Sequence, residues 1–217
     1  MSTLALSLAP PRSRTAARVV FQVSCAVAGS LLIAGLAQVS FTLGFTPVPI
    51  TGQTLGVLLV GAAYGPGLGA ATVLLYLLEA VFHAPFLAPN KDGSHDVGLQ
   101  VLRLSFASAG YLWGFVVAAG LTGWLAKRGW DRTFRSAIGA MFLGEVAIYA
   151  FGLPWLHQAL PALMGKPVSW QTTMELGLYP FVVGDAVKLM LAAGALPLAW
   201  KAMDRFRPSG VGAGPRR

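Results

Sequence analysis

Asp185 and Lys188 are the residues of this chain whose types and spacing most directly suggest chemistry. They lie three positions apart in an apolar run that extends from Phe181 to about Trp200. On a helix, residues three apart share a face, so the carboxylate and the ammonium point the same way. Each charge near the centre of a bilayer costs roughly 2.5–3.5 kcal/mol on insertion scales. The pair therefore predicts a functional site inside a membrane protein.

The composition predicts the membrane segments that position this pair. Hydrophobic residues make up 55% of the chain and charged residues only 11%, against about 25% charged in a typical soluble domain. The apolar residues form six blocks, approximately 17–39, 50–64, 66–83, 104–126, 134–156 and 176–200. The second and third are shorter than the roughly 20 residues that span a bilayer, so we expect them to be tilted, partly re-entrant or buried. The predicted fold is an all-α integral membrane protein with six transmembrane helices.

The basic residues predict the orientation of these helices. Twelve of the 16 lie in three clusters, up to the start of the first block, from the end of the fourth block to the start of the fifth, and after the last block. By the positive-inside rule, both termini and the connection between blocks four and five are cytoplasmic. The net charge of +8 therefore indicates topology and contact with the lipid bilayer rather than nucleic-acid binding.

The domain organisation follows from the same pattern. We expect a cytoplasmic N-terminal segment over 1–16, one membrane domain over 17–201, and a cytoplasmic, disordered tail over 202–217. We also expect no ordered structure through Arg14. The apolar stretch that starts at Val19 is longer than the core of a cleaved signal peptide, so it is read as a retained helix.

Motifs that the chain lacks narrow its function. It has no Walker A sequence and no serine-hydrolase or zinc-protease signature, and its single cysteine, Cys25, excludes an intrachain disulfide. We expect no cofactor, and no metal, because four candidate ligands match no metal-site spacing: His83, Asp92, His95 and Asp96. A binding subunit is favoured over an enzyme. Two alternatives stay open, a membrane enzyme that uses Asp185, Glu145 and His157, and a structural subunit.

Two segments are neither apolar helices nor basic connections. Residues 41–54 contain Pro47 and Pro49, which cannot continue a helix. Irregular backbone at membrane depth is tolerated only against protein or a polar cavity, so this segment is expected to cover or line a pocket at the outer side, or to be a plain turn. The long outer connection, 84–101, is expected to be a lid or a solvated loop.

Small residues follow one side of the first helix. Ala26, Ser30 and Ala34 form one stripe, and Ser24 and Ala28 form another. Such stripes let helices approach closely, either when a partner docks or when the helix packs inside its own chain. In the fifth block, Glu145 is a second acid within a span. Pairing with Lys188, ligand contact and a proton relay remain alternatives for it.

Three motifs in order carry a resemblance to a known family. Residues 47–61 read PVPITGQTLGVLLVG and are followed by YGPGLG at 64–69, residues 108–115 read SAGYLWGF, and residues 184–188 read GDAVK. The chain resembles the BioY family of biotin transporters from Phe21 to Trp200. It departs at 106–108, which read FAS where the family usually has Gly-Pro-Thr. Phe106 therefore adds bulk beside the expected pocket.

The resemblance implies a fold, a ligand and partners. It implies a six-helix S component of an energy-coupling factor (ECF) transporter in a bacterial or archaeal cell membrane. Such a component captures biotin from the outer side and is energised by a transmembrane coupling protein and two ATPase subunits. It implies docking through Ala26, Ser30 and Ala34. An S component for another vitamin remains an alternative.

Biotin carries a carboxylate, an apolar chain, a thioether ring and a ureido group, so the implied site needs cations, donors, acceptors and an apolar wall. We expect Asp185 to accept from the ureido N–H groups, and Lys188 or Arg103 to meet the carboxylate or the ureido carbonyl. Asn90 and Gln53 are the amide candidates. Tyr111, with Trp113, is expected to supply the wall.

Overall fold

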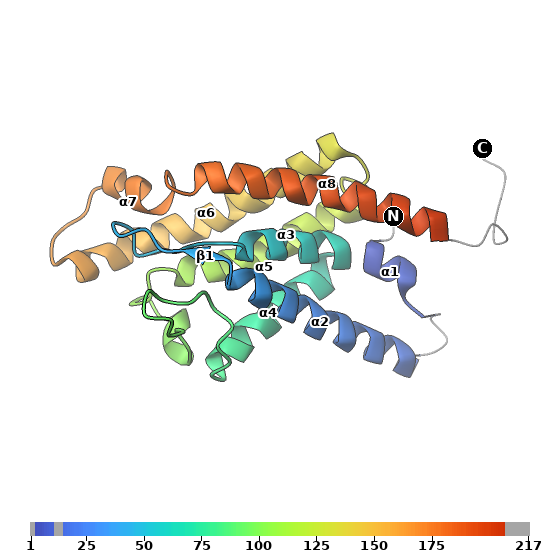
Figure 1. The fold of residues 1–217 in the computed structure, drawn as a ribbon, viewed down its shortest axis with the longest axis horizontal. Coiled ribbons are helices and arrows are strands. Elements are labelled where there is room, and N and C mark those ends of the chain that lie inside the picture. The colour runs from blue at the N-terminus through green and yellow to red at the C-terminus, as the bar shows by residue number, and fades with distance from the viewer. Residues whose placement is uncertain (1–2, 11–14, 207–217) are drawn as a thin grey trace.

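The computed structural model describes residues 3–10 and 15–206 as an elongated bundle of helices (Figure 1). The elements are, in chain order, α1 Leu4–Leu8, α2 Thr15–Ala37, β1 Ser40–Phe41, β2 Ile50–Thr51, α3 Gln53–Tyr64, α4 Pro66–Val81, the 3₁₀-helix η1 Leu99–Leu102, α5 Ala109–Lys127, α6 Phe134–Met164, α7 Trp170–Gly177 and α8 Val182–Phe206. The predicted all-α class is confirmed, with six apolar helices: α2, α3, α4, α5, α6 and α8.

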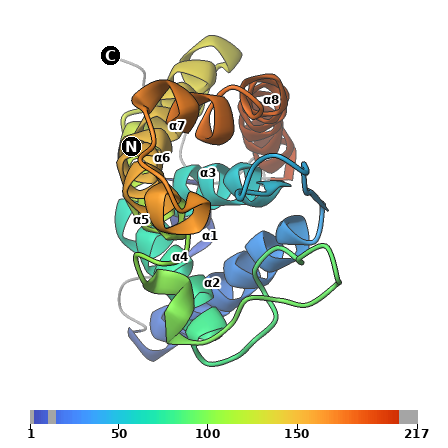
Figure 2. The same cartoon turned by 90° about the vertical axis from the view of Figure 1, so that its left-hand side faces the viewer.

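Four of these helices, α2, α5, α6 and α8, are long and apolar enough to cross a membrane. The other two, α3 and α4, have 12 and 16 residues, as their short blocks predicted. Gly65, with φ +85°, ends α3, and Pro66 begins α4, because glycine adopts this backbone conformation readily and proline suits the first helical turn. Seen end-on, α3 lies inside the bundle, in contact with α2, α4, α5 and α8 (Figure 2).

Glycine allows α3 and α5 to pack backbone against backbone. A Cβ added to Gly61 of α3 would lie 2.6 Å from the carbonyl oxygen of Ala119 of α5. A Cβ added to Gly123 of α5 would lie 2.6 Å from the carbonyl oxygen of Gly61. Both distances are too short for a real side chain, so only glycine fits at this crossing.

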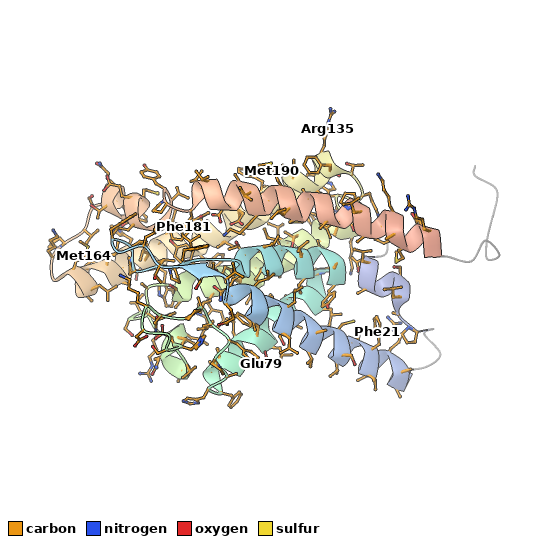
Figure 3. All side chains as sticks on the ribbon, viewed as in Figure 1. Phe21, Glu79, Arg135, Met164, Phe181 and Met190 are labelled. Atoms are coloured by element: carbon orange, nitrogen blue, oxygen red, sulfur yellow. The ribbon has the colours of Figure 1, made fainter. Side chains whose placement is uncertain are left out.

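The last predicted block, 176–200, includes the end of one helix as well as most of the helix that bears the charged pair. The helix α7 ends at Gly177 and α8 begins at Val182, because Pro180 lacks an N–H donor and disfavours a helical conformation at Tyr179. The preceding helix, α6, extends to Met164, beyond the predicted end at 156. It runs from Arg135 at its start to Met164 at its end, and Phe181 lies toward the Met164 end of the molecule (Figure 3). As a result α8 starts close to the connections at that end.

The N-terminal segment contains structure where we predicted none. Thr3 is fully buried, and the short helix α1 contacts α3. Ser7 lies with its Oγ 3.2 Å from Met203 Sδ, so α1 also touches the last turns of α8. That helix continues five residues past the predicted boundary at 201, because its final turns pack against α1. Residues 207–217 of the predicted tail lie outside the described residues.

Candidate functional site

Asp185 and Lys188 form an ion pair at the start of α8. Lys188 Nζ lies 2.7 Å from Asp185 Oδ1, and both side chains are largely buried. Asp185 lies in the first helical turn, where the helix dipole favours a carboxylate. The sequence predicted that the two would share a face, and the structure confirms this contact.

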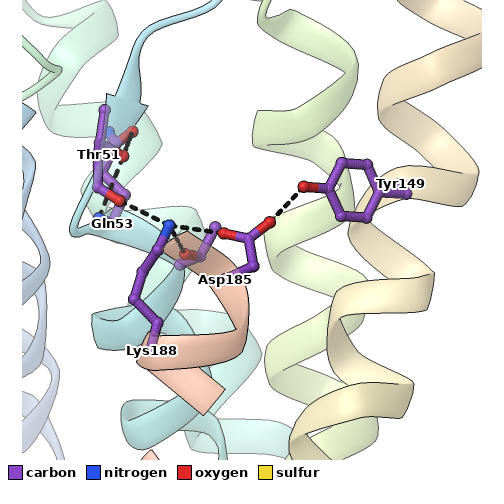
Figure 4. Close-up of polar contacts among 6 residues, drawn as sticks. Thr51, Gln53, Tyr149, Asp185 and Lys188 are labelled. Atoms are coloured by element: carbon purple, nitrogen blue, oxygen red, sulfur yellow. Dashed lines mark hydrogen bonds and ion pairs between the residues drawn. The ribbon is translucent and has the colours of Figure 1, made fainter. Parts of the chain in front are cut away.

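Partners from three other elements complete the network around this pair (Figure 4). Lys188 Nζ also donates to the carbonyl oxygen of Thr51 at 2.9 Å and to Thr54 Oγ1 at 2.9 Å. The hydroxyl of Tyr149, on α6, donates to Asp185 Oδ2. Both charges are therefore held by hydrogen bonds as well as by each other, which is the condition under which a buried ion pair is tolerated.

A pocket lies against this network, toward the end of the bundle that contains α7 and away from α1 (Figure 1). Besides the network it is lined by the 42–49 connection, the outer loop, α5 and Phe181: Pro47, Val48, Pro49, Gln53, Leu87, Ala88, Asn90, Asp96, Phe106, Ser108, Tyr111, Leu112, Phe115 and Phe181. The predicted role of residues 41–54 as a pocket wall agrees with this placement. Aromatic and aliphatic side chains surround a small polar centre, as in many small-molecule sites.

The 42–49 connection is fixed by a two-stranded ladder and by α7. Ser40 pairs with Thr51 and Phe41 with Ile50. Thr46 Oγ1 donates to the carbonyl oxygen of Leu176 at 2.6 Å. A Cβ on Gly52 would lie 2.6 Å from the carbonyl oxygen of Leu36, so glycine is required where this segment crosses the end of α2.

Two predicted amides line the pocket in different ways. Gln53 is buried, and its Nε2 donates to Tyr76 Oη at 2.5 Å. Tyr76 in turn donates to the carbonyl oxygen of Phe86 at 3.0 Å, so Gln53 ties α3 to α4 and to the outer loop. Asn90 is exposed, at the mouth of the pocket, and donates to Ser94 Oγ at 3.2 Å. A direct role in ligand contact stays a prediction for both.

The outer loop lines part of the pocket, while its turn at 90–93 is exposed to solvent. Pro89 and His95 form an isolated antiparallel bridge, and His95 Nδ1 lies 2.7 Å from the carbonyl oxygen of Leu87. Among the described residues, no three His, Cys, Asp or Glu side chains gather as a metal site would require. In this loop a hydrogen bond from Ser94 lowers the pKa of Asp92.

The aromatic and cationic candidates divide between the pocket and the surface. Tyr111 lines the pocket and donates to the carbonyl oxygen of Gly177 at 2.9 Å. Phe106, which stands in the FAS sequence, also lines it, as its bulk predicted. Trp113 is 38% exposed, and neither it nor Arg103, which is also exposed, is among the lining residues. A contact between Arg103 and a ligand carboxylate stays a prediction.

Sequence reasoning missed Tyr149 and the two threonines. Thr51 and Thr54 lie inside the motif that was singled out, but no role was assigned to them. Tyr149 lies four residues after Glu145 and therefore on the same helix face, which is the one signal that could have marked it. Its partner on α8 depends on how two distant segments pack.

The small-residue stripe of α2 faces its own bundle. Ser30 and Ala34 are buried, Ala26 is half-buried, and Ser30 Oγ donates to Glu79 Oε1 of α4 at 3.2 Å. Ser30 and Ala34 therefore pack inside their own chain, which is one of the two interpretations that the sequence left open. The second stripe, Ser24 and Ala28, is exposed. A docking role for Ala26, Ser30 and Ala34 stays a prediction.

Comparison with known proteins places the chain in a family. The BioY family model matches residues 11–205. The biotin transporter BioY of Rhizobium etli is 34% identical over 159 residues, covering 70% of this chain and 78% of that protein. The biotin transporter BioY of Rhodobacter capsulatus is 33% identical over 193 residues, covering 83% of this chain and 95% of that protein.

A solved structure shares the fold. The crystal structure of the S-component for biotin from an ECF-type ABC transporter superposes with a TM-score of 0.69 at 22% identity, covering 89% of this chain and 95% of that chain. The six apolar helices therefore have the S-component arrangement in a multi-pass membrane protein. Since the family match includes the whole described bundle from α2 to the last turns of α8, and with it every residue that lines the pocket, the chain belongs to the BioY family.

Proposed function

We propose that this chain captures biotin at the outer side of the membrane as the S component of an ECF-type transporter. The observation that carries the proposal is the Asp185–Lys188 pair, which stands against a largely apolar pocket with polar groups at its centre. Relatives that cover most of the chain are named biotin transporters. The chain is thus a transport subunit and not an enzyme.

The chemistry of the pocket matches the parts of biotin. Asp185 accepts hydrogen bonds from the ureido N–H groups, for which its two oxygens are oriented by Tyr149 and Lys188. Lys188 donates to the ureido carbonyl or to the carboxylate by exchanging one of its contacts with Thr51 or Thr54. Such an exchange replaces one charge-assisted hydrogen bond with another of similar strength.

The remaining candidates act further from the charged pair. Tyr111 and Phe106 provide the apolar wall for the ring and the chain. Asn90 and Gln53 offer amides along the pocket. Arg103 meets the carboxylate at the mouth only if its exposed side chain turns inward, so Lys188 and Arg103 are competing candidates for that group.

The orientation of the bundle supports capture from outside. The short helix α1 and the last turns of α8 lie toward one end of the molecule, while α7 and the β1–β2 connection, which lines part of the pocket, lie toward the other (Figure 1). The basic α5–α6 connection contacts Trp200 in the last turns of α8, and by the positive-inside rule this end is cytoplasmic. The pocket then opens toward the outer side.

We propose that a transmembrane coupling protein and two ATPase subunits energise uptake, and that they dock on α2. Docking through Ser30 and Ala34 requires α2 to move away from α4, because both side chains are buried. Docking through Ser24 and Ala28 requires no such movement. Ala34→Trp and Ala28→Trp separate these routes when biotin binding and cellular uptake are both measured. Normal uptake with both variants contradicts docking through α2.

Direct binding of biotin to the purified chain tests the function. We expect saturable binding that Asp185→Asn weakens strongly, with Glu175→Gln, an exposed acid on α7, as the matched control. Thermal-shift measurements with other vitamins address the alternative ligand class, and the absence of any product addresses a membrane enzyme. A vitamin other than biotin that stabilises the chain more strongly would contradict the proposed ligand.

A further inference from the structure

Glu145 is a second buried acid beside the network, and the network does not use it. It lies on α6 and is 4% exposed. Neither of its carboxylate oxygens has a hydrogen-bond partner among the described residues. An ionised carboxylate that is buried without a partner is far more costly than the neutral acid. The geometry therefore favours a Glu145 that holds its proton.

Lys188 has no donor left for Glu145. An ammonium group has three N–H donors, and Lys188 uses them on Asp185 Oδ1, the carbonyl oxygen of Thr51 and Thr54 Oγ1. An ion pair with Glu145 would require one of these contacts to break. In the described residues Glu145 therefore does not pair with Lys188, although the sequence left that pairing open.

Glu145 lines a lateral groove that shares two of its lining residues with the ligand pocket. The groove, about 710 Å³ in volume, lies between α6, α7 and α8, and Glu145, Tyr149 and Asp185 all line it. Tyr149 and Asp185 also line the ligand pocket. Glu145 stands one helical turn before Tyr149, whose hydroxyl donates to Asp185. A change of charge at Glu145 is therefore felt at the pocket through two shared residues.

The titratable groups around Glu145 are few. They are Tyr149 on its own helix, Asp185 and Lys188 on α8, and Tyr111 on α5, whose ring packs edge-on against Tyr149. The residues that α7 contributes to the groove, Trp170 and Met174, do not titrate. Lys188 is the one cation in this set. Two ionised acids would thus compete for one ammonium group.

We propose that Glu145 is a proton-binding positioning residue of the ligand pocket. As a neutral acid it does not compete for the ammonium group of Lys188, which stays paired with Asp185 and can donate to the ligand. When it loses the proton, its charge repels the Asp185 carboxylate and draws Lys188 away from Thr51 and Thr54, and the ligand binds more weakly. An added unit charge next to a charged pair in a partly shielded interior changes the interaction energy by about 1 kcal/mol or more, which is roughly tenfold in affinity.

A pH profile of biotin affinity tests this role, and it rests on the proposed function because biotin is the probe. The purified full chain, Glu145→Gln and the control Glu175→Gln are compared from neutral to alkaline pH. We expect wild type and Glu175→Gln to lose affinity as pH rises. Glu145→Gln, which stays neutral and keeps the shape, should bind like wild type at neutral pH and keep its affinity over the pH range in which the wild type loses it. Identical profiles for wild type and Glu145→Gln overturn the proposal, as does a large loss for Glu145→Gln at neutral pH.

A second measurement needs no ligand. The infrared spectrum of the wild type at neutral pH should contain the carbonyl stretch of a protonated carboxylic acid, and Glu145→Gln should lack that band. Absence of the band in the wild type overturns the proposal, and so does failure of Glu145→Gln to fold, because the amide mimics the neutral acid. If biotin does not bind the wild type, the proposed function fails while this band still decides the state of Glu145.

Discussion

Two buried aspartates near opposite ends of the molecule have similar local contacts. Asp185 accepts a hydrogen bond from Tyr149, and Asp131, in the α5–α6 connection, accepts one from Trp200 Nε1 at 2.6 Å. Each has a cation nearby, Lys188 at 2.7 Å and Arg132 at 3.7 Å. Asp131 is even more buried, at 1% exposed against 6% for Asp185.

The surroundings of the two aspartates differ. Asp185 faces a pocket, and its cation is itself buried and bonded to two further oxygens. Asp131 lines neither the pocket nor the groove, and the guanidinium of Arg132 stacks 3.3 Å from the centre of the Trp200 ring with 37% of the side chain exposed. Asp131 thus fastens the α5–α6 connection to α8, whereas Asp185 presents charge to a ligand. Burial and an aromatic donor alone do not identify a binding site; the adjoining pocket does.

The largest expected effect comes from removing the pocket's cation. Lys188→Ala leaves Asp185 buried with one partner fewer, and losing one member of a buried pair costs about 3–5 kcal/mol. We expect biotin affinity to fall by several hundredfold or more, measured by calorimetry on the purified protein. Lys166→Ala, at an exposed position, is the control. Unchanged affinity in Lys188→Ala and in Asp185→Asn would reject the site.

Removing the aromatic donor at the pocket should have a smaller effect. Tyr149→Phe leaves one oxygen of Asp185 without its donor, and an unsatisfied buried acceptor costs about 1–3 kcal/mol. Affinity for biotin should fall about tenfold with little change in melting temperature. Tyr179→Phe, at a residue that is 59% exposed, should leave affinity unchanged. A loss of stability without a loss of affinity would make Tyr149 structural, like Trp200.

Removing the aromatic donor to Asp131 should lower the stability of the protein rather than its affinity for biotin. Trp200→Phe removes the donor to Asp131, and we expect a loss of about 1–3 kcal/mol of unfolding free energy, with biotin affinity retained. Thermal unfolding in detergent and biotin binding are measured on the same sample. If Trp200→Phe lowers biotin affinity as much as Tyr149→Phe does, the two ends are coupled, and the contrast between a binding role for Asp185 and a structural role for Asp131 is wrong.

The smallest effect concerns pH. Burial raises the pKa of Asp131, although the Trp200 hydrogen bond and Arg132 act against the shift. The folded protein therefore holds this proton more tightly than the unfolded chain. The stability that the protonated acid contributes is fully present below its ordinary pKa and is lost as pH rises through the raised value.

Asp131→Asn removes this titration and keeps an acceptor for Trp200. The melting temperature of the variant, relative to that of the wild type, should therefore increase as pH rises from acid to neutral. The increase should be a few degrees at most, because 1 kcal/mol corresponds to about 2–4 °C in a chain of this size. A gain that is constant with pH, or largest in acid, would contradict the raised pKa.

Much of the fold follows from local sequence properties. Apolar blocks of defined length predicted six helices, and Gly65-Pro66 explains the break between the second and third blocks, because composition and backbone restrictions act within a few residues. Likewise, spacing alone placed Asp185 and Lys188 on one face of α8. The missed break before α8 came from underestimating Pro180, and the missed helix α1 from a segment that is ordered only by contact with α3 and α8.

The sequence by itself determined the class of the protein, the order of its helices and the presence of an acid–base pair in a membrane segment. These features depend on residues that are close together in the chain. Only the tertiary structure decided that Tyr149 and Thr54 hold this pair, that Gln53 bonds Tyr76, that Ser30 faces α4 and that Glu145 stands beside the network without a partner. Each of these depends on which helices pack together, and such contacts join residues far apart in the chain. Hydrogen-bond partners across helix interfaces leave no local pattern to read.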